Sequence, residues 1–571
     1  MRYLAFATDY DGTLATDGAV EEGTVRALEN LKASGRRLLL VTGRHLRDLQ
    51  LAFAKLELFD RVVAENGAVL YAPASHEERV LVEAPKEEFL EALRAAEVKF
   101  AVGRAIVSSW TPAETMILEV IKRLGLDYQV IFNKGAVMVL PSGITKATGL
   151  RMGLEDLRLS LHNVVAMGDA ENDHALLSQS ECGVAVANAL PALQETADLV
   201  TKHNNGAGVV ELIEQLLKDD LRAYDQRLAR SAITIGVEHG TKSGEVRIVP
   251  NRDNVLVAGA SASGKSSAVA GIVEEAEQRG YQFCLIDPEG DFEGLAGAMP
   301  IGSPTEPPDA NMVEKALKSP GSTIVNLMGV PLAERPDAFA TLLPRILEGR
   351  AKTGRPHWLV IDEAHHLLPA TWAPAASAIP QELAGTILIT VHPEQVSPAA
   401  LALVDVVVAL GEAAGATVAE FARAVHMAEP SELPAKPPES GQALLWLARR
   451  GKPLVLLQTL RAKSERRRHK RNYAQGELSP EQSFYFRGPD GKLNLRAQNL
   501  LTFLQLGEGV DEETWLFHLR RGDFSRWFES VIKDEELASS AREIERAGLV
   551  LVAEGRKKLR EAVESRYTGS A

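Results

Sequence analysis

Short apolar runs, many of which end in a polar residue or a glycine, recur along most of the chain. From residue 1 to about 215 they alternate with helical patterns, and the runs read YLAFAT, RRLLLVT, RVVAENG, NVVAMG and CGVAVA. The same texture resumes after about residue 250 with NVLVAG, FCLIDP, HWLVIDE, TILITV and VDVVVALG. Short strands that alternate with helices form βαβ units, whose strands pair in parallel. The sequence therefore predicts an α/β protein with two parallel sheets.

The length of the chain and the changes in its pattern predict three parts. At 571 residues the chain exceeds a single hydrophobic core, because domains usually hold about 100–200 residues. Two amphipathic helices and a strand pair at 127–141 interrupt the first βαβ pattern and predict a small α/β insert. The expected parts are a first domain at 1–217 with its insert at about 75–145, a linker at 218–245 with a charged helical pattern at 218–232, a second α/β domain at 246–460, and a mainly helical segment with a basic run at 461–571.

Charge and hydropathy limit the partners of this chain. The net charge of −14 argues against a globally basic nucleic-acid binder. The basic run at 461–471 leaves a nucleic-acid contact open, although a solvated helix face or linker is the favoured interpretation. No apolar run approaches the ~20 residues that span a bilayer, and the N-terminus meets an acidic residue too early for a signal peptide. Cys182 and Cys284 lie in or beside apolar runs, so we expect buried thiols in a cytoplasmic protein.

Two acidic residues, Asp9 and Asp11, follow the first apolar run. In a strand, residues i and i+2 point to the same side, so the two carboxylates would converge and repel each other. A divalent cation would remove this repulsion, and one carboxylate could then attack a phosphorus atom while the other donates a proton. Gly12 permits a sharp turn and Thr13 adds a hydroxyl. The alternative interpretation is a solvated Asp-Gly turn.

Further polar residues follow other apolar runs of the same region. Thr42 supplies a hydroxyl suited to a phosphoryl oxygen, and Lys146 supplies a cation that could offset negative charge. Asp169 and Asp173, in VVAMGDAENDHAL, are hard oxygen ligands suited to Mg²⁺. Residues just past parallel strands meet at the carboxyl edge of the sheet, where α/β proteins bind ligands. The sequence therefore predicts a magnesium-dependent phosphate site.

This set of motifs resembles the haloacid dehalogenase superfamily, in its Cof-type branch with an α/β cap. The chain contains DxDGT, a threonine, a lysine and GDxxND in that order, and the insert at 75–145 stands where that branch carries its cap. The resemblance implies a Rossmann-like sheet and an aspartyl-phosphate mechanism on a small, sugar-phosphate-like substrate. The implied roles are Asp9 as nucleophile, Asp11 as general acid/base, and Thr42 and Lys146 as ligands of the phosphoryl group. The implied Mg²⁺ ligands are Asp9, the backbone carbonyl of Asp11, Asp169 and Asp173. The remaining phosphate-binding candidates are Thr13, Gly43 and Asn172, of which Asn172 either orients a ligand or forms a turn.

A second phosphate motif begins the second α/β region. In NVLVAGASASGKSS an apolar run precedes Gly259-x4-Gly264-Lys265-Ser266, and a helical pattern follows. Glycines let backbone N–H groups surround phosphate oxygens, the lysine reaches the β- and γ-phosphates, and the serine binds Mg²⁺. The alternative is a glycine-rich turn. The expected ATP-binding residues are Gly259, Ser263, Gly264, Lys265, Ser266 and Ser267.

The run HWLVIDE provides the complement of a P-loop. Asp362 would hold Mg²⁺ through water, and Glu363 would polarise the attacking water, which favours ATP hydrolysis over phosphotransfer. FCLIDPEGDFEGL resembles the second-strand motif of the HerA/FtsK branch of P-loop ATPases, with a RecA-like sheet. That resemblance implies homo-oligomers such as hexameric rings, but His392 stands where the branch usually has a glutamine.

Together the motifs predict a bifunctional enzyme: a phosphomonoesterase whose activity is coupled to, or regulated by, an ATPase. Its expected cofactor is Mg²⁺, and its expected ligands are ATP and a small phosphorylated metabolite. One alternative is an ATP-driven nucleic-acid machine with a phosphate-trimming site. The other is a signalling or scaffold protein whose assembly follows its bound nucleotide.

Overall fold

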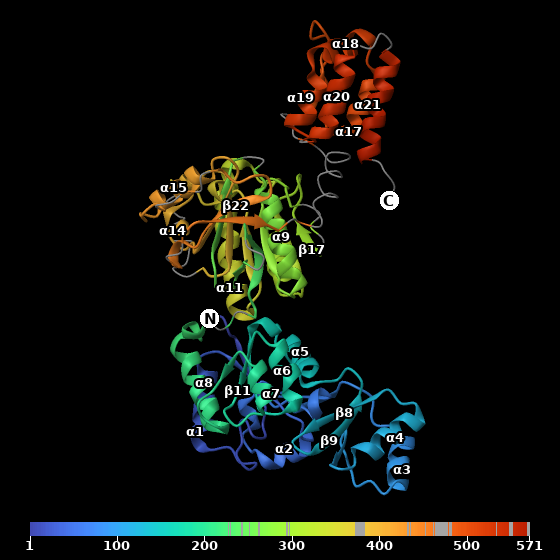
Figure 1. Ribbon diagram of the computed structural model, residues 1–571, viewed down its shortest axis with the longest axis vertical. Helices are drawn as coiled ribbons and strands as arrows, with labels where there is room; N and C mark the ends of the chain where they lie inside the picture. The colour runs from blue at the N-terminus through green and yellow to red at the C-terminus, as the bar shows by residue number, and fades with distance from the viewer. Residues whose placement is uncertain are drawn as a thin grey trace. The chain divides into compact units, whose positions relative to one another are not determined.

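The computed structural model describes residues 1–225, 228, 230–240, 244–250, 252–260, 263–292, 295, 297–371, 383–430, 433, 436–450, 453–460, 462, 478, 482–532, 534–547 and 552–567 (Figure 1). The chain forms two compact units. The first unit holds residues 1–291 and 297–460, and the second holds 292–296 and 461–571. Among the described residues, no helix is both long and apolar enough to cross a membrane.

The first sheet has eight strands in the order β12-β11-β10-β1-β2-β3-β4-β5. Neighbours from β12 to β3 pair in parallel, and β4 and β5 continue the sheet antiparallel. The parallel strands are buried nearly throughout, as expected for a sheet covered on both faces. The strands are β1 (Ala5–Thr8), β2 (Arg37–Val41), β3 (Arg61–Ala64), β4 (Val69–Ala72), β5 (Glu77–Val80), β10 (Val164–Gly168), β11 (Cys182–Ala185) and β12 (Leu199–Val200).

The order of these strands places the predicted phosphate site. Strand β1 lies between β10 and β2, so the loops that follow all three meet at one edge of the sheet. The predicted Rossmann-like parallel sheet is therefore confirmed. Its helices are α1 (Glu22–Ala33), α2 (Leu46–Ala52), α5 (Lys146–Asp156), α6 (His174–Gln179), α7 (Pro191–Thr196) and α8 (Asn205–Asp219).

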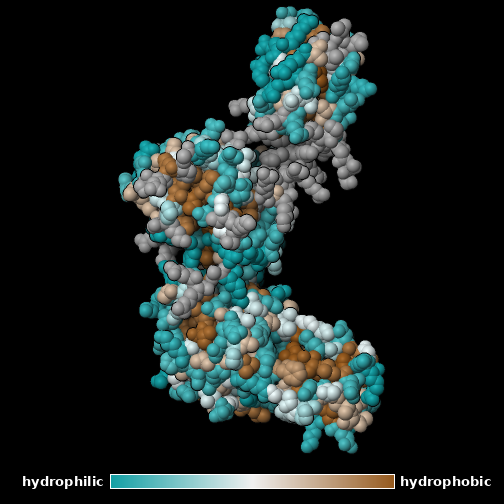
Figure 2. All heavy atoms as spheres, viewed as in Figure 1, coloured by the Kyte–Doolittle hydropathy of each residue, from teal (hydrophilic) through white to brown (hydrophobic). Residues whose placement is uncertain are grey.

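The insert forms a separate antiparallel sheet in the order β6-β7-β9-β8, which we call the cap. Its elements are α3 (Glu87–Ala95), β6 (Ala101–Val102), β7 (Val107–Trp110), α4 (Glu114–Leu124), β8 (Tyr128–Asn133) and β9 (Ala136–Pro141). Side chains of β9 alternate between two clusters: Val137 and Val139 pack with α3 and α4, whereas Met138 and Leu140 pack with Ala68 of the first sheet's region. Figure 2 shows hydrophobic side chains on the visible face over β8 and β9. The predicted strand pair is confirmed.

The second sheet has eleven strands in the order β14-β13-β23-β22-β21-β15-β20-β19-β16-β18-β17. From β21 to β17 all neighbours are parallel, and the four other strands pair antiparallel. The strands are β13 (Ile233–Glu238), β14 (Glu245–Ile248), β15 (Val255–Gly259), β16 (Phe283–Asp287), β17 (Ala298–Ile301), β18 (Ser322–Asn326), β19 (Trp358–Ile361), β20 (Thr386–Thr390), β21 (Val406–Leu410), β22 (Gln442–Trp446) and β23 (Val455–Thr459).

The segment expected to be a linker, 218–245, with a helical pattern at 218–232, differs from that expectation. Helix α8 ends at Asp219, and a single 3-10 turn follows at Arg222–Tyr224. Strand β13 then joins the second sheet by pairing with both β14 and β23. The second half of the expected linker is therefore part of the second sheet, because the apolar and β-branched residues of β13 pair between β14 and β23.

Helices cover the second sheet, and α9 (Lys265–Gln278) directly follows the glycine-rich motif. The other helices of this region are α10 (Ala310–Leu317), α11 (Arg335–Thr353), α12 (Ala364–Leu367), α14 (Pro398–Leu401) and α15 (Ala414–Ala424). The two cysteines, Cys182 and Cys284, are both fully buried in strands, as predicted. Burial raises the pKa of both thiols above the ordinary value.

The second unit is mainly helical, as the sequence predicts. It contains α17 (Leu500–Gly509), α18 (Glu512–Arg521), α19 (Asp523–Ser530), α20 (Glu535–Arg546) and α21 (Val552–Tyr567), with a two-stranded sheet of β24 (Phe484–Phe486) and β25 (Leu495–Ala497). Aromatic side chains, including Phe503, Phe524 and Trp527, form its core. The predicted basic run at 461–471 lies outside the described residues, apart from Ala462.

Candidate functional site

A buried lysine stands at the centre of the first site. Lys146, the first residue of α5, has no exposed surface, and its ammonium donates to Asp9 Oδ1 and Asp173 Oδ1 at 2.7 Å each. The Thr145 side chain caps the N-terminus of this helix and so fixes where the helix, with Lys146 as its first residue, begins. Burial lowers the pKa of Lys146, but the two carboxylates outweigh burial and leave its pKa above the ordinary value. The lysine is therefore a permanent cation against Asp9.

Asp169 completes a cluster of three buried carboxylates. One oxygen each from Asp9, Asp169 and Asp173 lies within 4.8 Å of the others. Asp169 accepts from the Thr13 hydroxyl at 3.0 Å, and Asp173 accepts from the backbone N–H groups of Asp169 and Ala170. Burial raises the pKa of Asp9 and of Asp169, although Lys146 opposes this effect at Asp9. Three hard oxygen ligands with one fully buried lysine leave a negative excess that fits a divalent cation such as Mg²⁺.

The Asp11 carboxylate does not join this cluster. The Arg44 guanidinium donates to both of its oxygens at 2.6 Å, through Nε and an Nη. Strand β1 ends at Thr8, so alternation along a strand no longer sets the direction of Asp11, and Gly12 turns the chain at φ +76°. The expectation that the Asp9 and Asp11 carboxylates converge on one point is therefore wrong, whereas the implied role of the Asp11 backbone carbonyl as a metal ligand stays a prediction. The bidentate pair instead fixes the Asp11 carboxylate at the edge of the site.

The predicted phosphate-binding residues surround Asp9. Thr42 is buried at the end of β2, where its hydroxyl oxygen accepts from the Arg44 N–H at 3.1 Å. Asn172 is buried and donates to Asn66 Oδ1 at 3.1 Å, and a Cβ on Gly43 would lie 3.4 Å from the Asn172 amide nitrogen. Among the described residues, Asn66 Nδ2 and Asn172 Oδ1 are buried without partners. This edge therefore offers polar groups that a bound ligand could satisfy.

The cap reaches the same edge. Lys134, in the turn between β8 and β9, places its ammonium on Asp169 Oδ2, and its backbone N–H donates to Glu171 at 3.2 Å. Ser108 of β7 contacts His45 at 3.1 Å, and Met138 lies next to Gly43. The cap is therefore closed over the carboxylate cluster.

A buried glutamate anchors the cap in this position. Glu65 follows β3 and accepts hydrogen bonds from the backbone N–H groups of Arg104, Ala105 and Ile106 at 2.8–3.2 Å. Its exposed fraction is 1%. Sequence reasoning assigned no role to Glu65, Asn66, Arg44 or Lys134. Their positions in the sequence could have indicated a role, because Arg44, Glu65 and Asn66 follow predicted strands and Lys134 lies in the turn of the cap's strand pair.

The second motif forms a strand, a loop and a helix. Gly259 (φ +153°) ends β15 and Gly264 (φ +95°) precedes α9, so both glycines adopt backbone angles that side chains disfavour. Lys265 is buried, and its ammonium donates to the carbonyl oxygens of Gly259 and Ala260 at 3.0 Å. The Ser263 hydroxyl is buried and has no partner among the described residues. Loop residues 261–262 lie outside the described residues.

Acidic residues from neighbouring strands meet this helix start. Ser266, whose hydroxyl donates to Asp291 at 3.2 Å, is followed along α9 by Ser267. Asp362 follows β19 and is buried, and burial, together with Asp287, raises its pKa well above the ordinary value. Burial also raises the pKa of Glu363 to about 7, with a contribution from Glu289. Strand β20 separates β19 from β15, so these acids face the loop across one strand.

The histidines of this region have different surroundings. His365 contacts Thr390 Oγ1 at 3.1 Å and Glu363 at 3.3 Å, and burial lowers its pKa to about 4. His392, which stands where the HerA/FtsK branch usually has a glutamine, has a side chain that is 53% exposed.

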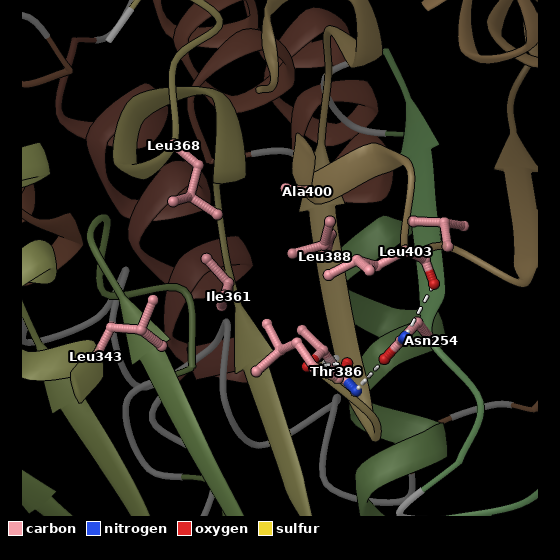
Figure 3. A pocket seen from close by; sticks show the side chains of 10 residues that line it. Asn254, Leu343, Ile361, Leu368, Thr386, Leu388, Ala400 and Leu403 are labelled. Carbon is pink, nitrogen blue, oxygen red and sulfur yellow. Dashed lines mark hydrogen bonds between the residues drawn. The ribbon is translucent and has the colours of Figure 1, made fainter. Parts of the chain in front are cut away.

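A separate pocket lies beside β19 and β20 (Figure 3). Eight of its ten lining residues are aliphatic, and none is charged. Its polar side chains already have partners: Asn254 donates to the Leu403 carbonyl at 2.9 Å and accepts from the Thr386 N–H at 3.1 Å. Asn254 precedes β15 and Thr386 begins β20, so both residues lie at the edge of the second sheet where its parallel strands begin. The pocket is therefore a packing gap away from the P-loop.

Comparison with known proteins places the first site in a family. The model of haloacid dehalogenase-like hydrolases matches residues 6–110 and 112–213. Similar proteins include a phosphoglycolate phosphatase from Metallosphaera sedula (32% identical, over 37% of this chain and 97% of that protein), one from Methanothermobacter thermautotrophicus (30%, 37% and 98%), and phosphoglycolate phosphatase 2 from Saccharolobus solfataricus (28%, 38% and 92%). A solved haloacid dehalogenase-like hydrolase from Bacteroides thetaiotaomicron aligns with a TM-score of 0.34 and 22% identity, over 38% of this chain and 99% of its own. Through its residues 6–213, the chain belongs to the haloacid dehalogenase-like hydrolases.

Proposed function

We propose that residues 1–217 hydrolyse phosphomonoesters through Asp9 as the nucleophile. The observation that carries this proposal is the buried Asp9 carboxylate, which Lys146 holds beside Asp169 and Asp173. Lys146 binds Oδ1 of Asp9 and so leaves Oδ2 to attack phosphorus. A Mg²⁺ ion bound by the carboxylate cluster, with the Asp11 carbonyl as a further ligand, would neutralise charge on the phosphoryl group.

In this proposal Asp11 is the general acid and base. Its carboxyl group donates a proton to the leaving oxygen as Asp9 forms an aspartyl-phosphate, and then accepts a proton from the water that hydrolyses this intermediate. In the structure Arg44 donates to both Asp11 oxygens, so Asp11 must leave at least one of these hydrogen bonds to carry the proton that it donates. Thr42, Thr13 and Asn172 line the phosphoryl site as hydrogen-bonding groups, and Gly43 leaves room for it.

The substrate that we propose is a compact phosphorylated acid. Proteins that are 28–32% identical over this region carry the name phosphoglycolate phosphatase. The cap closes over the site with Lys134 and Met138, which supports a small leaving group. This substrate class differs from the small, sugar-phosphate-like substrate that the resemblance alone implies.

We further propose that residues 246–460 bind and hydrolyse ATP. Support comes from the buried Lys265 at the start of α9, from Ser266 beside Asp291, and from Asp362 with Glu363 at the end of β19. In this proposal the glycines Gly259 and Gly264 let backbone N–H groups approach the phosphates, and Ser263 and Ser267 add hydroxyl groups. Glu363 polarises the attacking water, because burial brings its pKa to about 7. Coupling to the phosphatase and assembly into a homo-oligomer remain part of this proposal.

Phosphate release by a Lys265→Ala protein tests both activities together. With Mg²⁺ present, this variant is expected to release phosphate from phosphoglycolate but not from ATP, because the substitution removes only the second site's cation. The matched Lys146→Ala protein is expected to show the opposite pattern. If folded Lys265→Ala protein releases no phosphate from any phosphomonoester in a panel of acids, sugars and nucleotides, the phosphatase proposal fails. If Lys265→Ala hydrolyses ATP at the wild-type rate, the ATPase proposal fails.

A further inference from the structure

Lys134 is a cap residue whose positively charged side chain contacts the carboxylate cluster of Asp9, Asp169 and Asp173. Its ammonium lies on Asp169 Oδ2 and within 2.9 Å of where a Cβ on Gly12 would stand. Its backbone, at φ +46°, is held by the hydrogen bond to Glu171. The side chain is nevertheless 42% exposed, so solvent and small solutes reach it. Lys134 therefore contacts the buried carboxylate cluster and is accessible from solvent at the same time.

Among the other described cap residues at this edge, Arg104 is charged, but its guanidinium pairs with Glu78 at 2.9 Å, and Ser108 and Met138 are neutral. Ser108 contacts His45 through its hydroxyl, and Met138 approaches Gly43 through its thioether. On the first sheet's side, the Arg44 guanidinium is taken up by Asp11 with two hydrogen bonds, and Lys146 is enclosed by carboxylates. Among the residues that the structure describes, Lys134 is thus the cap cation whose ammonium contacts the carboxylate cluster and also reaches solvent.

Its present partner is one that a metal ion would also use. Asp169 is fully buried and already accepts from Thr13 through Oδ1. A cation bound by Asp169 competes with the Lys134 ammonium for Oδ2, because two cations at one oxygen repel each other. The lysine then needs a different anion close to Asp9.

We infer that Lys134 is the specificity-determining residue of the site and that its ammonium binds the carboxylate of a compact phosphorylated acid. This inference rests on the proposed phosphatase function. The closed cap gives the distance scale: the lysine turn lies against Asp169, so an anion only a few bonds from phosphorus falls within its reach. A substrate whose carboxylate is replaced by a neutral group loses this contact and keeps every contact to phosphate.

Binding of unreactive analogues tests the inference without turnover. The probes are 3-phosphonopropionate, which carries a carboxylate, and propylphosphonate, which does not, each titrated by calorimetry into the full chain with Mg²⁺. A charge-assisted hydrogen bond corresponds to about a 10- to 100-fold preference for the acid in the wild type. Lys134→Met is expected to bring this preference close to one while leaving propylphosphonate affinity within about threefold.

A second cap variant controls for a general loss of positive charge. Lys122 is exposed on α4, the helix that covers the sheet face opposite Met138, so Lys122→Met changes the same charge away from the site. It is expected to keep the wild-type preference. If Lys134→Met loses affinity equally for both analogues, the lysine only closes the cap, and this result would overturn the inference. An unchanged preference would overturn it as well.

Kinetics separate this inference from the function on which it rests. If wild-type protein hydrolyses neither phosphoglycolate nor ethyl phosphate, the proposed phosphatase fails. If the wild type prefers phosphoglycolate and Lys134→Met retains that ratio of kcat/KM values, the phosphatase stands and the role of Lys134 fails.

Discussion

Replacing Lys146 by methionine leaves two buried carboxylates without their cation. The lysine is fully buried and makes two charge-assisted hydrogen bonds of 2.7 Å, to Asp9 and Asp173. Methionine keeps an apolar stem of similar length, so packing changes little. Removal of one partner from a buried ion pair costs about 3–5 kcal/mol. Asp173 keeps two backbone N–H donors, and Asp9 can take up a proton because burial raises its pKa, so the lower end of that range is expected.

Urea unfolding at pH 7 in metal-free buffer measures this loss. The Lys146→Met protein is expected to lose about 3 kcal/mol in its free energy of unfolding. The double variant with Asp9→Asn has one uncompensated charge fewer, so it should recover about 1–3 kcal/mol of coupling energy. A single variant within 1 kcal/mol of wild type would refute the reasoning that the buried lysine neutralises this cluster. A double variant in which the two losses simply add would refute it equally.

Three further predictions follow from the geometry. Gly67→Ala should lower the free energy of unfolding by more than about 1 kcal/mol, because Gly67 has φ +108° and a Cβ would overlap the Thr145 carbonyl oxygen at the start of α5. The control is Gly35→Ala, where φ is +91° and a Cβ would meet open space, so this variant measures the backbone strain alone. Equal losses of stability in the two variants would contradict the overlap. ATP hydrolysis should rise with pH around a midpoint near 7, because Glu363 must lose its proton to polarise water and burial raises its pKa to about 7. Glu363→Gln should lower the ATPase rate about 10²–10⁴-fold while retaining ATP binding, and a pH-independent wild-type rate would contradict this role. Asp11→Asn should lower kcat for phosphoglycolate about 10²–10⁴-fold, measured by phosphate release, and an unchanged kcat would exclude Asp11 as the acid.

The sequence predicted the parts of the structure that depend on local pattern. Runs of apolar residues located the parallel strands, and polar residues after β1, β2 and β10 were expected at one edge because parallel strands share their direction. The cap's strand pair at 127–141 was likewise visible from its alternation. Predicting these features needs only the periodicity of the apolar residues and the rule that α/β proteins bind ligands at the carboxyl ends of their strands.

Other features depend on contacts between distant segments. The pairing of Asp11 with Arg44 could not be predicted from strand alternation, because β1 ends at Thr8. Lys134 reaches Asp169 only because the cap folds back onto the first sheet, which no local period encodes. Strand β13 joins the second sheet by pairing Gly236 with Thr459, a contact between distant segments that the prediction of a linker at 218–245 could not include.

Hydrolysis of phosphoglycolate by wild-type and Asp9→Asn protein tests the central claim most directly. Both proteins are assayed for phosphate release with Mg²⁺, and far-UV circular dichroism verifies that the variant is folded. Because the amide cannot attack phosphorus as a carboxylate does, release by Asp9→Asn should fall to the uncatalysed background while wild type turns over. Folded Asp9→Asn protein that releases phosphate at the wild-type rate would contradict the account, since the chemistry would then not depend on the carboxylate that Lys146 holds.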